Sequence, residues 1–518
     1  MRRTRRTLAL AGVILAGASL SVATALPAQA VDYTPISGAG SSWSANAIEQ
    51  WRTNVQQYGM RVNYASTGSS DGRNQYRNGT VDYAVTEIPY GLKDGQVIDE
   101  PPANRPFAYM PIVAGGTSLM YNLTSGGKQI TNLRLSGDVI TKIFTGAINK
   151  WDDPAIVADN PGVTLPSRTI VPVVRSDGSG STAQFTAWMA AKYGDIWGSY
   201  CQEAGRGSGC GLTSNFPVVS GKGFVAQPNS TGVAGYVKQR ANDGTITYVE
   251  YSYALNAGFP VAKVLNAAGY YVEPTPQNVA VGLLGATINS DLTSNLTGVY
   301  DNSDPRAYPM SSYSYMIVPT GNEYNFTNEK GNTLGAFAAY FLCEGQQQAP
   351  ALGYSPLPIN LVQSGFEQIA KIPGAASTVP DIASCNNPTF SADGSNTLAN
   401  TAPQPEECDK KGSTQCTTGT GGAANTSTAA GGAAGGAAGG TGGTGGFGTG
   451  GGSLSGPMSC NADTGQCVAV LAESVGLDAG PGWTLGSTIM LVAVLLLIGL
   501  IVVPPITSRV LESRRANR

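Results

Sequence analysis

Residues 173–189 read VVRSDGSGSTAQFTAWM, and they decide how the rest of the chain is interpreted. The apolar residues before Arg175 are typical of a strand, and the apolar spacing after Ser181 predicts a helix. The N-terminus of a helix presents free backbone N–H groups at the positive end of its dipole. Two interpretations follow: an ordinary strand-to-helix turn with a serine cap, or a loop that holds an anion.

The alternation of strands and helices continues on both sides of this stretch and predicts an α/β protein. Strands are predicted at 60–67, 80–87, 169–176, 246–255 and 311–319, and two more within 107–123, separated by Gly115 and Gly116. Helices are predicted at 44–58, 135–153 and 183–193.

Serine-rich loops recur before the predicted helices, at 38–46, 66–76, 175–185 and 228–237. Any one of them is explained by ordinary N-capping. Several such loops in one α/β chain, one of them beside Arg175, favour an anion site. None of them has the Gly-Lys-Ser/Thr spacing of a nucleotide-binding phosphate loop.

Composition restricts the chemistry that the chain can perform. Among its 518 residues there is no histidine, the usual general base, nucleophile activator and metal ligand. A phosphatase or other hydrolase is therefore disfavoured. Between the predicted signal peptide and the C-terminal tail, 23 basic and 33 acidic residues leave a net charge of about −10. That charge argues against nucleic acid as a partner, so an anion has to be held by local donors.

Both ends of the chain predict export. Arginines, an apolar run and Ala-Gln-Ala make residues 1–30 a signal peptide. Residues 484–503 carry no charge and at helical rise span about 30 Å, so we expect a transmembrane helix. Arginines in 504–518 place that tail in the cytoplasm and the body on the extracellular face of the membrane.

The segment before this helix differs in composition from the body. Residues 381–416 form a cysteine-containing extension, 417–456 a glycine-rich linker predicted to be flexible, and 457–483 a cysteine-containing juxtamembrane segment. The eight cysteines fit an oxidising compartment, and pairing of neighbours is the simplest arrangement. The expected disulfides are Cys201–Cys210, Cys343–Cys385, Cys408–Cys416 and Cys460–Cys467. A zinc site is the alternative, but no Cys-x-x-Cys spacing supports it.

A family resemblance rests on motifs spread over residues 31–380. They are GAGSSWSA (38–45), VNYASTGSSDG (62–72), VDYAVTE (81–87), FTGAINKWDDPAI (144–156), VVRSDGSGST (173–182), YVEYSYA (248–254), YPMSSYSYMIV (308–318) and LGYSPLP (352–358). In order and spacing they resemble the substrate-binding proteins of phosphate-specific ABC transporters, the PstS type. No single motif would be specific, but the combination is.

The resemblance implies a bilobal clamshell of the type II periplasmic binding proteins. One lobe would comprise 31–106 and 307–380, and the other 107–306. The lobes would close on inorganic phosphate, which the protein would then hand to an ABC permease and its ATPase. No cofactor and no enzymatic activity are implied. A surface module for adhesion or sensing that keeps the fold, or a site for a related oxyanion, remains the alternative.

The resemblance also implies a set of phosphate ligands. They are Ser42, the backbone N–H of Trp43, Ser69, Arg175, Ser179, Gly180 and Ser181. Asp177 would orient Arg175, although an ordinary turn or cap explains it equally well.

Glu87 departs from the family pattern, in which an aspartate ends the corresponding segment. That carboxylate accepts a hydrogen bond from a protonated phosphate oxygen and repels sulfate, which has no such proton at neutral pH. Glutamate keeps the acceptor but is one methylene longer. We therefore expect the site to shift to fit the longer side chain and the rejection of sulfate to survive, while the affinity and the preference between phosphate and arsenate stay open.

Overall fold

The computed structural model describes residues 33–94, 97–207, 210–376, 380–391, 394–412, 414–428, 458–460 and 467–469. The predicted signal peptide, transmembrane helix and cytoplasmic tail lie outside the described residues, as do 429–456 of the predicted linker and most of 457–483. Within the described residues, no helix combines the length and the apolar character needed to cross a bilayer.

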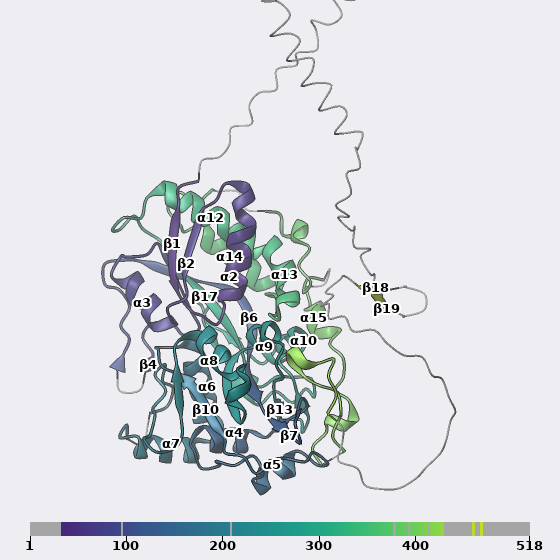
Figure 1. The fold of residues 1–518 in the computed structure, drawn as a ribbon. Coiled ribbons are helices and arrows are strands. Elements are labelled where there is room, and N and C mark those ends of the chain that lie inside the picture. Colours follow the sequence, from purple (N-terminus) through teal and green to yellow (C-terminus); the bar gives the residue numbers. More distant parts are fainter. Residues whose placement is uncertain are drawn as a thin grey trace, which may run out of the picture. The chain divides into compact units, whose positions relative to one another are not determined.

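An eight-stranded sheet forms the central layer of the body (Figure 1), in the order β11-β10-β12-β6-β17-β3-β1-β2. β1, β2 and β3 are parallel at one end, which we call lobe I, and β10, β11 and β12 are parallel at the other, lobe II. The bounds are β1 Ile36–Gly40, β2 Val62–Ala65, β3 Tyr83–Thr86, β6 Phe107–Asn122, β10 Val171–Arg175, β11 Val225–Gln227, β12 Thr245–Glu250 and β17 Ser311–Pro319. The predicted α/β class is confirmed.

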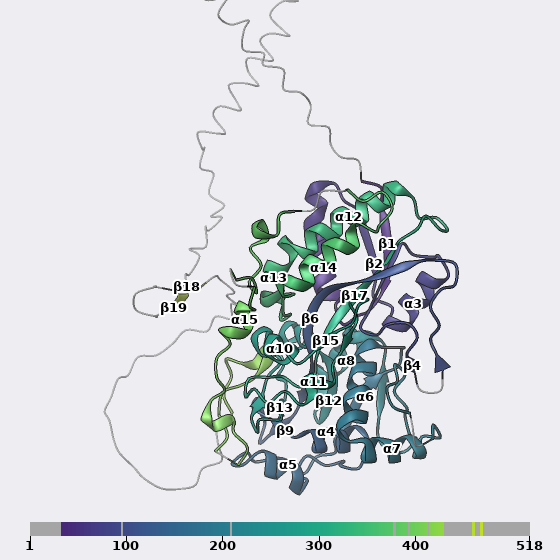
Figure 2. The same cartoon turned by 180° about the vertical axis from the view of Figure 1, so that it is seen from behind.

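Helices cover both faces of this sheet in two groups (Figures 1 and 2). Lobe I carries α2 (Ala45–Asn54), α3 (Ser69–Arg77), α12 (Asn328–Leu342), α13 (Glu344–Leu352) and α14 (Ile359–Ile369). Lobe II carries α4 (Gly137–Phe144), α5 (Pro154–Asp159), α6 (Gly180–Lys192), α7 (Gly194–Glu203), α8 (Asn229–Val237), α9 (Tyr251–Ala257) and α10 (Pro276–Leu283). The parallel strands and their following helices place each strand-to-helix loop at the boundary between the lobes.

The strand β6 joins the two lobes. Residues 107–116 pair antiparallel with β17, and 117–122 pair antiparallel with β12. The prediction of two strands broken at Gly115 and Gly116 is wrong, because one 16-residue strand runs through both positions. A Cβ at Gly115 would lie 2.7 Å from the Trp43 ring, and one at Gly116 would lie 2.4 Å from Pro274. These glycines therefore allow close packing on a continuous strand that both lobes share.

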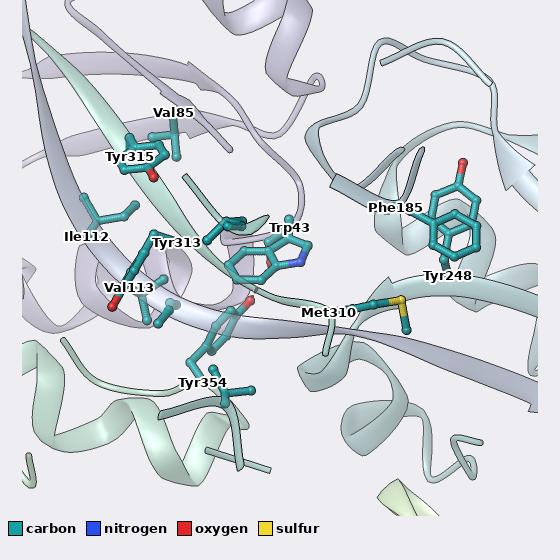
Figure 3. Packing of buried hydrophobic residues seen from close by; sticks show 14 of the residues in the cluster. Trp43, Val85, Ile112, Val113, Phe185, Tyr248, Met310, Tyr313, Tyr315 and Tyr354 are labelled. Carbon is teal, nitrogen blue, oxygen red and sulfur yellow. Dashed lines mark hydrogen bonds between the residues drawn. The ribbon is translucent and has the colours of Figure 1, made fainter. Parts of the chain in front are cut away.

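The apolar core extends along this shared strand into both lobes (Figure 3). Trp43 is buried edge-on against Tyr354, with ring centroids 5.8 Å apart. In lobe II, Phe185 of α6 stacks on Tyr248 of β12 at 4.8 Å. The residue that follows Ser42 and the helix that follows Arg175 are thus fixed by large aromatic contacts.

Three of the four predicted disulfides are present: Cys201–Cys210, Cys343–Cys385 and Cys408–Cys416. The fourth predicted pair lies in the short strands β18 (Met458–Cys460) and β19 (Cys467–Ala469), whose backbone register sets Cys460 opposite Cys467. The bond itself rests on side chains outside the described residues, so it stays a prediction.

Residues 381–428, which we call the C-terminal strap, pass from lobe I to lobe II. The strap contains η3 (Ile382–Cys385), α15 (Thr397–Asn400), η4 (Glu407–Asp409) and η5 (Gly421–Ala423). Cys343–Cys385 attaches its first part to lobe I. Further on, Arg306 Nη1 donates to the Ala399 carbonyl over 3.1 Å, on the lobe II side.

The end of the strap corrects the prediction of a flexible linker that begins at residue 417. Thr420 is fully buried, and its N–H donates to the Thr131 carbonyl over 2.9 Å. Gly421 N–H donates to Glu273 Oε2 over 2.9 Å, and Thr428 Oγ1 accepts the Thr131 N–H over 2.8 Å. The composition of this segment offers few apolar side chains for packing. The segment is held on lobe II by hydrogen bonds that involve backbone groups.

Candidate functional site

The third predicted loop begins where β10 ends, at Arg175. The guanidinium of Arg175 is buried, and its Nε donates to Asp177 Oδ1 over 2.8 Å, with Nη2 paired to Asp177 Oδ2. Asp177 also accepts the backbone N–H of Asn229 over 2.9 Å. The orienting role predicted for Asp177 matches this geometry. One edge of the guanidinium is thereby fixed, and Nη1 on the other side donates to Ser230 Oγ over 3.4 Å.

The helix α6 starts directly after this loop. Ser179 is its N-cap, because the Ser179 hydroxyl accepts the N–H of Thr182 over 3.2 Å. Gly180 N–H donates to Ser69 Oγ of lobe I over 3.1 Å. Among the described residues, the Ser181 hydroxyl is buried and has no hydrogen-bond partner. A buried hydroxyl without a partner is costly, so this helix start offers an unused donor to a ligand.

Glu87 follows β3 and points into the same space. Its carboxylate accepts hydrogen bonds from the hydroxyls of Ser41, of Ser69 over 2.7 Å and of Ser314 over 2.9 Å. A Cβ on Gly180 would lie 1.9 Å from Glu87 Oε2, so the carboxylate lies against the start of α6. Burial raises the pKa of Glu87, and hydrogen bonds from the three serines, with the charge of Arg175, oppose that rise.

The first loop lies beside these groups, between β1 and α2. Ser42 Oγ is 3.0 Å from Ser230 Oγ, a residue of lobe II. The backbone N–H of Trp43, predicted to contact the anion, donates instead to Ser41 Oγ over 3.0 Å. Trp43 therefore lies at the site, but in this structure its N–H group already has a partner and is not free to contact an anion.

The lobes touch one another around this cluster. Ser70 N–H donates to the Gly178 carbonyl over 3.1 Å, and Gln184 Nε2 donates to the Glu87 carbonyl over 2.7 Å. Asn46 Nδ2 donates to Ser252 Oγ over 2.8 Å. Ser42, Ser69, Glu87, Arg175, Ser179 and Ser181 are each at most 3% exposed. A ligand can reach them only when the lobes separate, so the structure is a closed form.

Sequence reasoning missed three serines of the site: Ser41, Ser230 and Ser314. Ser41 and Ser230 lie in serine-rich loops that were recognised as helix starts, and a count of their hydroxyls would have suggested them. Ser314 gave no signal, since its role depends on which face of β17 meets Glu87.

The described cluster brings one cationic side chain together with two carboxyl groups. Arg175 is offset by Asp177, with which it shares two hydrogen bonds, and Glu87 adds a further acidic group. The remaining donors are neutral hydroxyls and backbone N–H groups at the start of α6. Such a site suits an oxyanion that carries one acidic proton, because it supplies many donors and one acceptor.

Comparison with known proteins identifies the family of the chain. The PBP superfamily domain matches residues 23–344. The phosphate-binding protein PstS of Xylella fastidiosa (strain Temecula1) is 32% identical over 331 residues, which cover 63% of this chain and 83% of that protein. PstS of Haemophilus influenzae is 30% identical over 336 residues, 64% of this chain and 90% of that protein.

Among solved structures, the phosphate-binding protein of Stenotrophomonas maltophilia aligns with 70% of this chain and 99% of its own, at 18% identity and a TM-score of 0.46. The domain match and the two sequence relatives each span most of the body that carries the site. The chain therefore belongs to the PBP superfamily and, within it, to the family of the phosphate-binding protein PstS.

Proposed function

We propose that this chain is an extracytoplasmic substrate-binding protein that captures inorganic phosphate between its lobes and delivers it to an ABC permease and its ATPase. The observation that carries the proposal is the position of Glu87. Its carboxylate lies against the start of α6, among donors from both lobes. The PstS relatives are named for phosphate binding, which supports binding rather than catalysis.

In this proposal each group has a defined task. Arg175 supplies charge-assisted hydrogen bonds, and Ser181 supplies the hydroxyl that lacks a partner within the described residues. Ser42 and Ser179 would supply further neutral donors. Ser69, Gly180 and the loop at Trp43 now donate to Glu87, Ser69 and Ser41, so they would exchange those partners for phosphate when it binds. Glu87 accepts the proton of a protonated phosphate oxygen. Sulfate offers no such proton at neutral pH and would leave two buried acceptors facing each other.

The location is proposed from independent features. Three disulfides fit an oxidising compartment outside the cytoplasm. Residues 484–503 would form a single transmembrane helix that holds the body on the extracellular face of the membrane, with 504–518 in the cytoplasm. Cleavage after Ala30 would release the mature N-terminus.

Titration calorimetry of the body with phosphate tests the function. We expect saturable one-to-one binding that sulfate barely displaces at pH 7.5. A surface module that only keeps the fold would give no heat with phosphate, and that result would end the transport proposal. Displacement by sulfate at equal concentration would instead remove the role given to Glu87.

A further inference from the structure

Ser230 lies at the meeting point of the two lobes. It is the second residue of α8 and is fully buried. Its helix follows β11, which pairs with β10 so that Gln227 lies beside Arg175. This register brings the start of α8 next to the guanidinium, in the same lobe as the start of α6.

Ser230 contacts Ser42 of lobe I through two atoms. Its backbone N–H donates to Ser42 Oγ over 3.0 Å, and its own Oγ lies 3.0 Å from the same oxygen. The neighbouring Tyr253 of lobe II also donates its hydroxyl to the Ser42 carbonyl. Ser42 is thus held at both ends by lobe II, although it belongs to the loop after β1.

Ser230 also contacts the cation of the site. Arg175 Nη1 donates to Ser230 Oγ over 3.4 Å, while Asp177 holds Nε and Nη2. The residue before Ser230, Asn229, donates its backbone N–H to Asp177. The start of α8 therefore fixes the guanidinium directly through Ser230 and indirectly through Asp177.

The hydroxyl protons of Ser42 and Ser230 are limited by these contacts. A serine hydroxyl has one proton and two lone pairs. When Ser230 accepts from Arg175 and donates to Ser42, both lone pairs of Ser42 are occupied, by the O–H and the N–H of Ser230. Ser42 can then only donate its own proton. With the reverse assignment, Ser230 keeps the spare proton instead.

We propose that Ser230 is a positioning residue that couples lobe closure to anion binding. On closure it pairs with Ser42 so that the two hydroxyls keep one spare proton for the ligand, and it holds Arg175 in the same step. The inference rests on the proposed phosphate function. Ser230 acts through Ser42 and Arg175, so its loss should lower the stability of the closed form and speed the dissociation of phosphate.

Calorimetry and stopped-flow binding of phosphate test this role with Ser230→Ala, Ser42→Ala and the double variant. Removal of a hydrogen bond in a charged network should raise the phosphate Kd by about 10-fold in Ser230→Ala, chiefly through faster dissociation. The double variant should bind about as weakly as Ser42→Ala alone, because both changes remove one coupled unit. Thr231→Ala, an exposed hydroxyl on the same helix, should match the wild-type protein.

Ser230→Cys keeps the side-chain shape with a weak hydrogen-bonding group, and it repeats the test if Ser230→Ala does not fold. Small-angle scattering at saturating phosphate should show a smaller closed fraction in both variants. Binding equal to that of the wild-type protein, or losses that simply add in the double variant, would overturn the role of Ser230 and leave phosphate binding intact. A wild-type protein that binds no phosphate would overturn both proposals.

Discussion

Ser69 donates a hydrogen bond of 2.7 Å to the carboxylate of Glu87, and its oxygen at the same time accepts the N–H of Gly180. Ser69 and Glu87 belong to lobe I, whereas Gly180 begins α6 in lobe II. The Ser69 hydroxyl therefore links the Glu87 carboxylate, the only one on the lobe I side of the described cluster, to the start of α6 in lobe II. The proposed selectivity group and one of the contacts between the lobes therefore share a hydroxyl.

Arg175→Ala should abolish tight phosphate binding. The guanidinium is the one cation of the described cluster, and hydrogen bonds from a charged group are each worth about 1.5–3 kcal/mol. We expect the Kd in calorimetry to rise by at least about 100-fold. Arg61→Ala, at an exposed position, is the control and should leave the Kd unchanged. Retained tight binding in Arg175→Ala would show that the anion is held elsewhere.

Glu87→Gln should admit sulfate. The amide keeps one oxygen but adds an N–H donor, so an oxyanion without a proton gains a partner where it met a carboxylate. Competition calorimetry at pH 7.5 should show the affinities for sulfate and phosphate drawing together. Glu367→Gln, exposed on α14, is the matched control. Unchanged rejection of sulfate would assign selectivity to another group.

Sulfate rejection by the wild-type protein should weaken in acid. Burial raises the pKa of Glu87, so the carboxyl takes up a proton at a higher pH than an exposed glutamate does. Once protonated, Glu87 donates instead of accepting, and the ratio of sulfate to phosphate affinity should rise as the pH falls. The same titration on Glu87→Gln should keep only the change that comes from the titration of phosphate itself, since the amide does not titrate, and it is the baseline for the wild-type protein. A ratio in the wild-type protein that follows this baseline from pH 8 to pH 5 would contradict the assignment.

Glu250→Gln tests a second buried acid, at the end of β12. Burial raises the pKa of Glu250 to about 8, although hydrogen bonds from Ser252 oppose the rise. Between the unfolded and folded pKa values the folded state binds the extra proton, so this group makes stability fall as the pH rises. One proton corresponds to about 1.4 kcal/mol per pH unit.

Urea unfolding between pH 5 and pH 8 should show a shallower decline in Glu250→Gln than in the wild-type protein. The two proteins should differ least near pH 5, the end of the range closest to the pKa of an exposed glutamate, because there the unfolded state has lost the smallest share of this proton. Parallel pH profiles would mean that Glu250 does not take up a proton on folding.

Removal of the Cys343–Cys385 bond by double substitution to serine should lower the free energy of unfolding by about 2–4 kcal/mol. The bond joins lobe I to the strap across 42 residues, whereas Cys201–Cys210 spans 9. By loop entropy, loss of the longer link should cost about 1 kcal/mol more. Phosphate affinity should stay unchanged, since neither cysteine contacts the site. Equal losses for the two pairs would point to native contacts rather than chain entropy.

Part of the candidate site follows from local sequence patterns, and part of it depends on contacts between distant segments. The positions of Arg175, Ser179 and Ser181 follow from one strand, the turn after it and the helix that begins there, and all three are visible as local sequence patterns. Ser230 and Ser314 reach the site from distant segments, and only the register of β10 with β11 and of β17 with β3 brings them there. No local pattern carries that information.

The two fold-level errors have a common cause. Gly115 and Gly116 were interpreted as a break, and the Gly- and Thr-rich residues 417–428 as a linker, because glycine usually marks flexible or turning backbone. In both places the backbone is instead packed closely. Gly115 of β6 lies against the Trp43 ring, and Thr420 of the strap donates its N–H to the Thr131 carbonyl. Composition indicates how flexible the backbone of an isolated segment would be. Tertiary contacts decide whether that segment is ordered in the folded protein.

The docking of Thr420 and Thr428 on lobe II changes where the folding unit ends. A protein shortened at Pro380, the limit of the family resemblance, would leave the N–H and C=O of Thr131 without their partners and would uncover Val261 and Glu273. We expect such a fragment to aggregate or to be trimmed by proteases. The smallest fragment that can be purified as a stable protein should extend through Thr428, well beyond residue 344, where the match to the PBP superfamily domain ends.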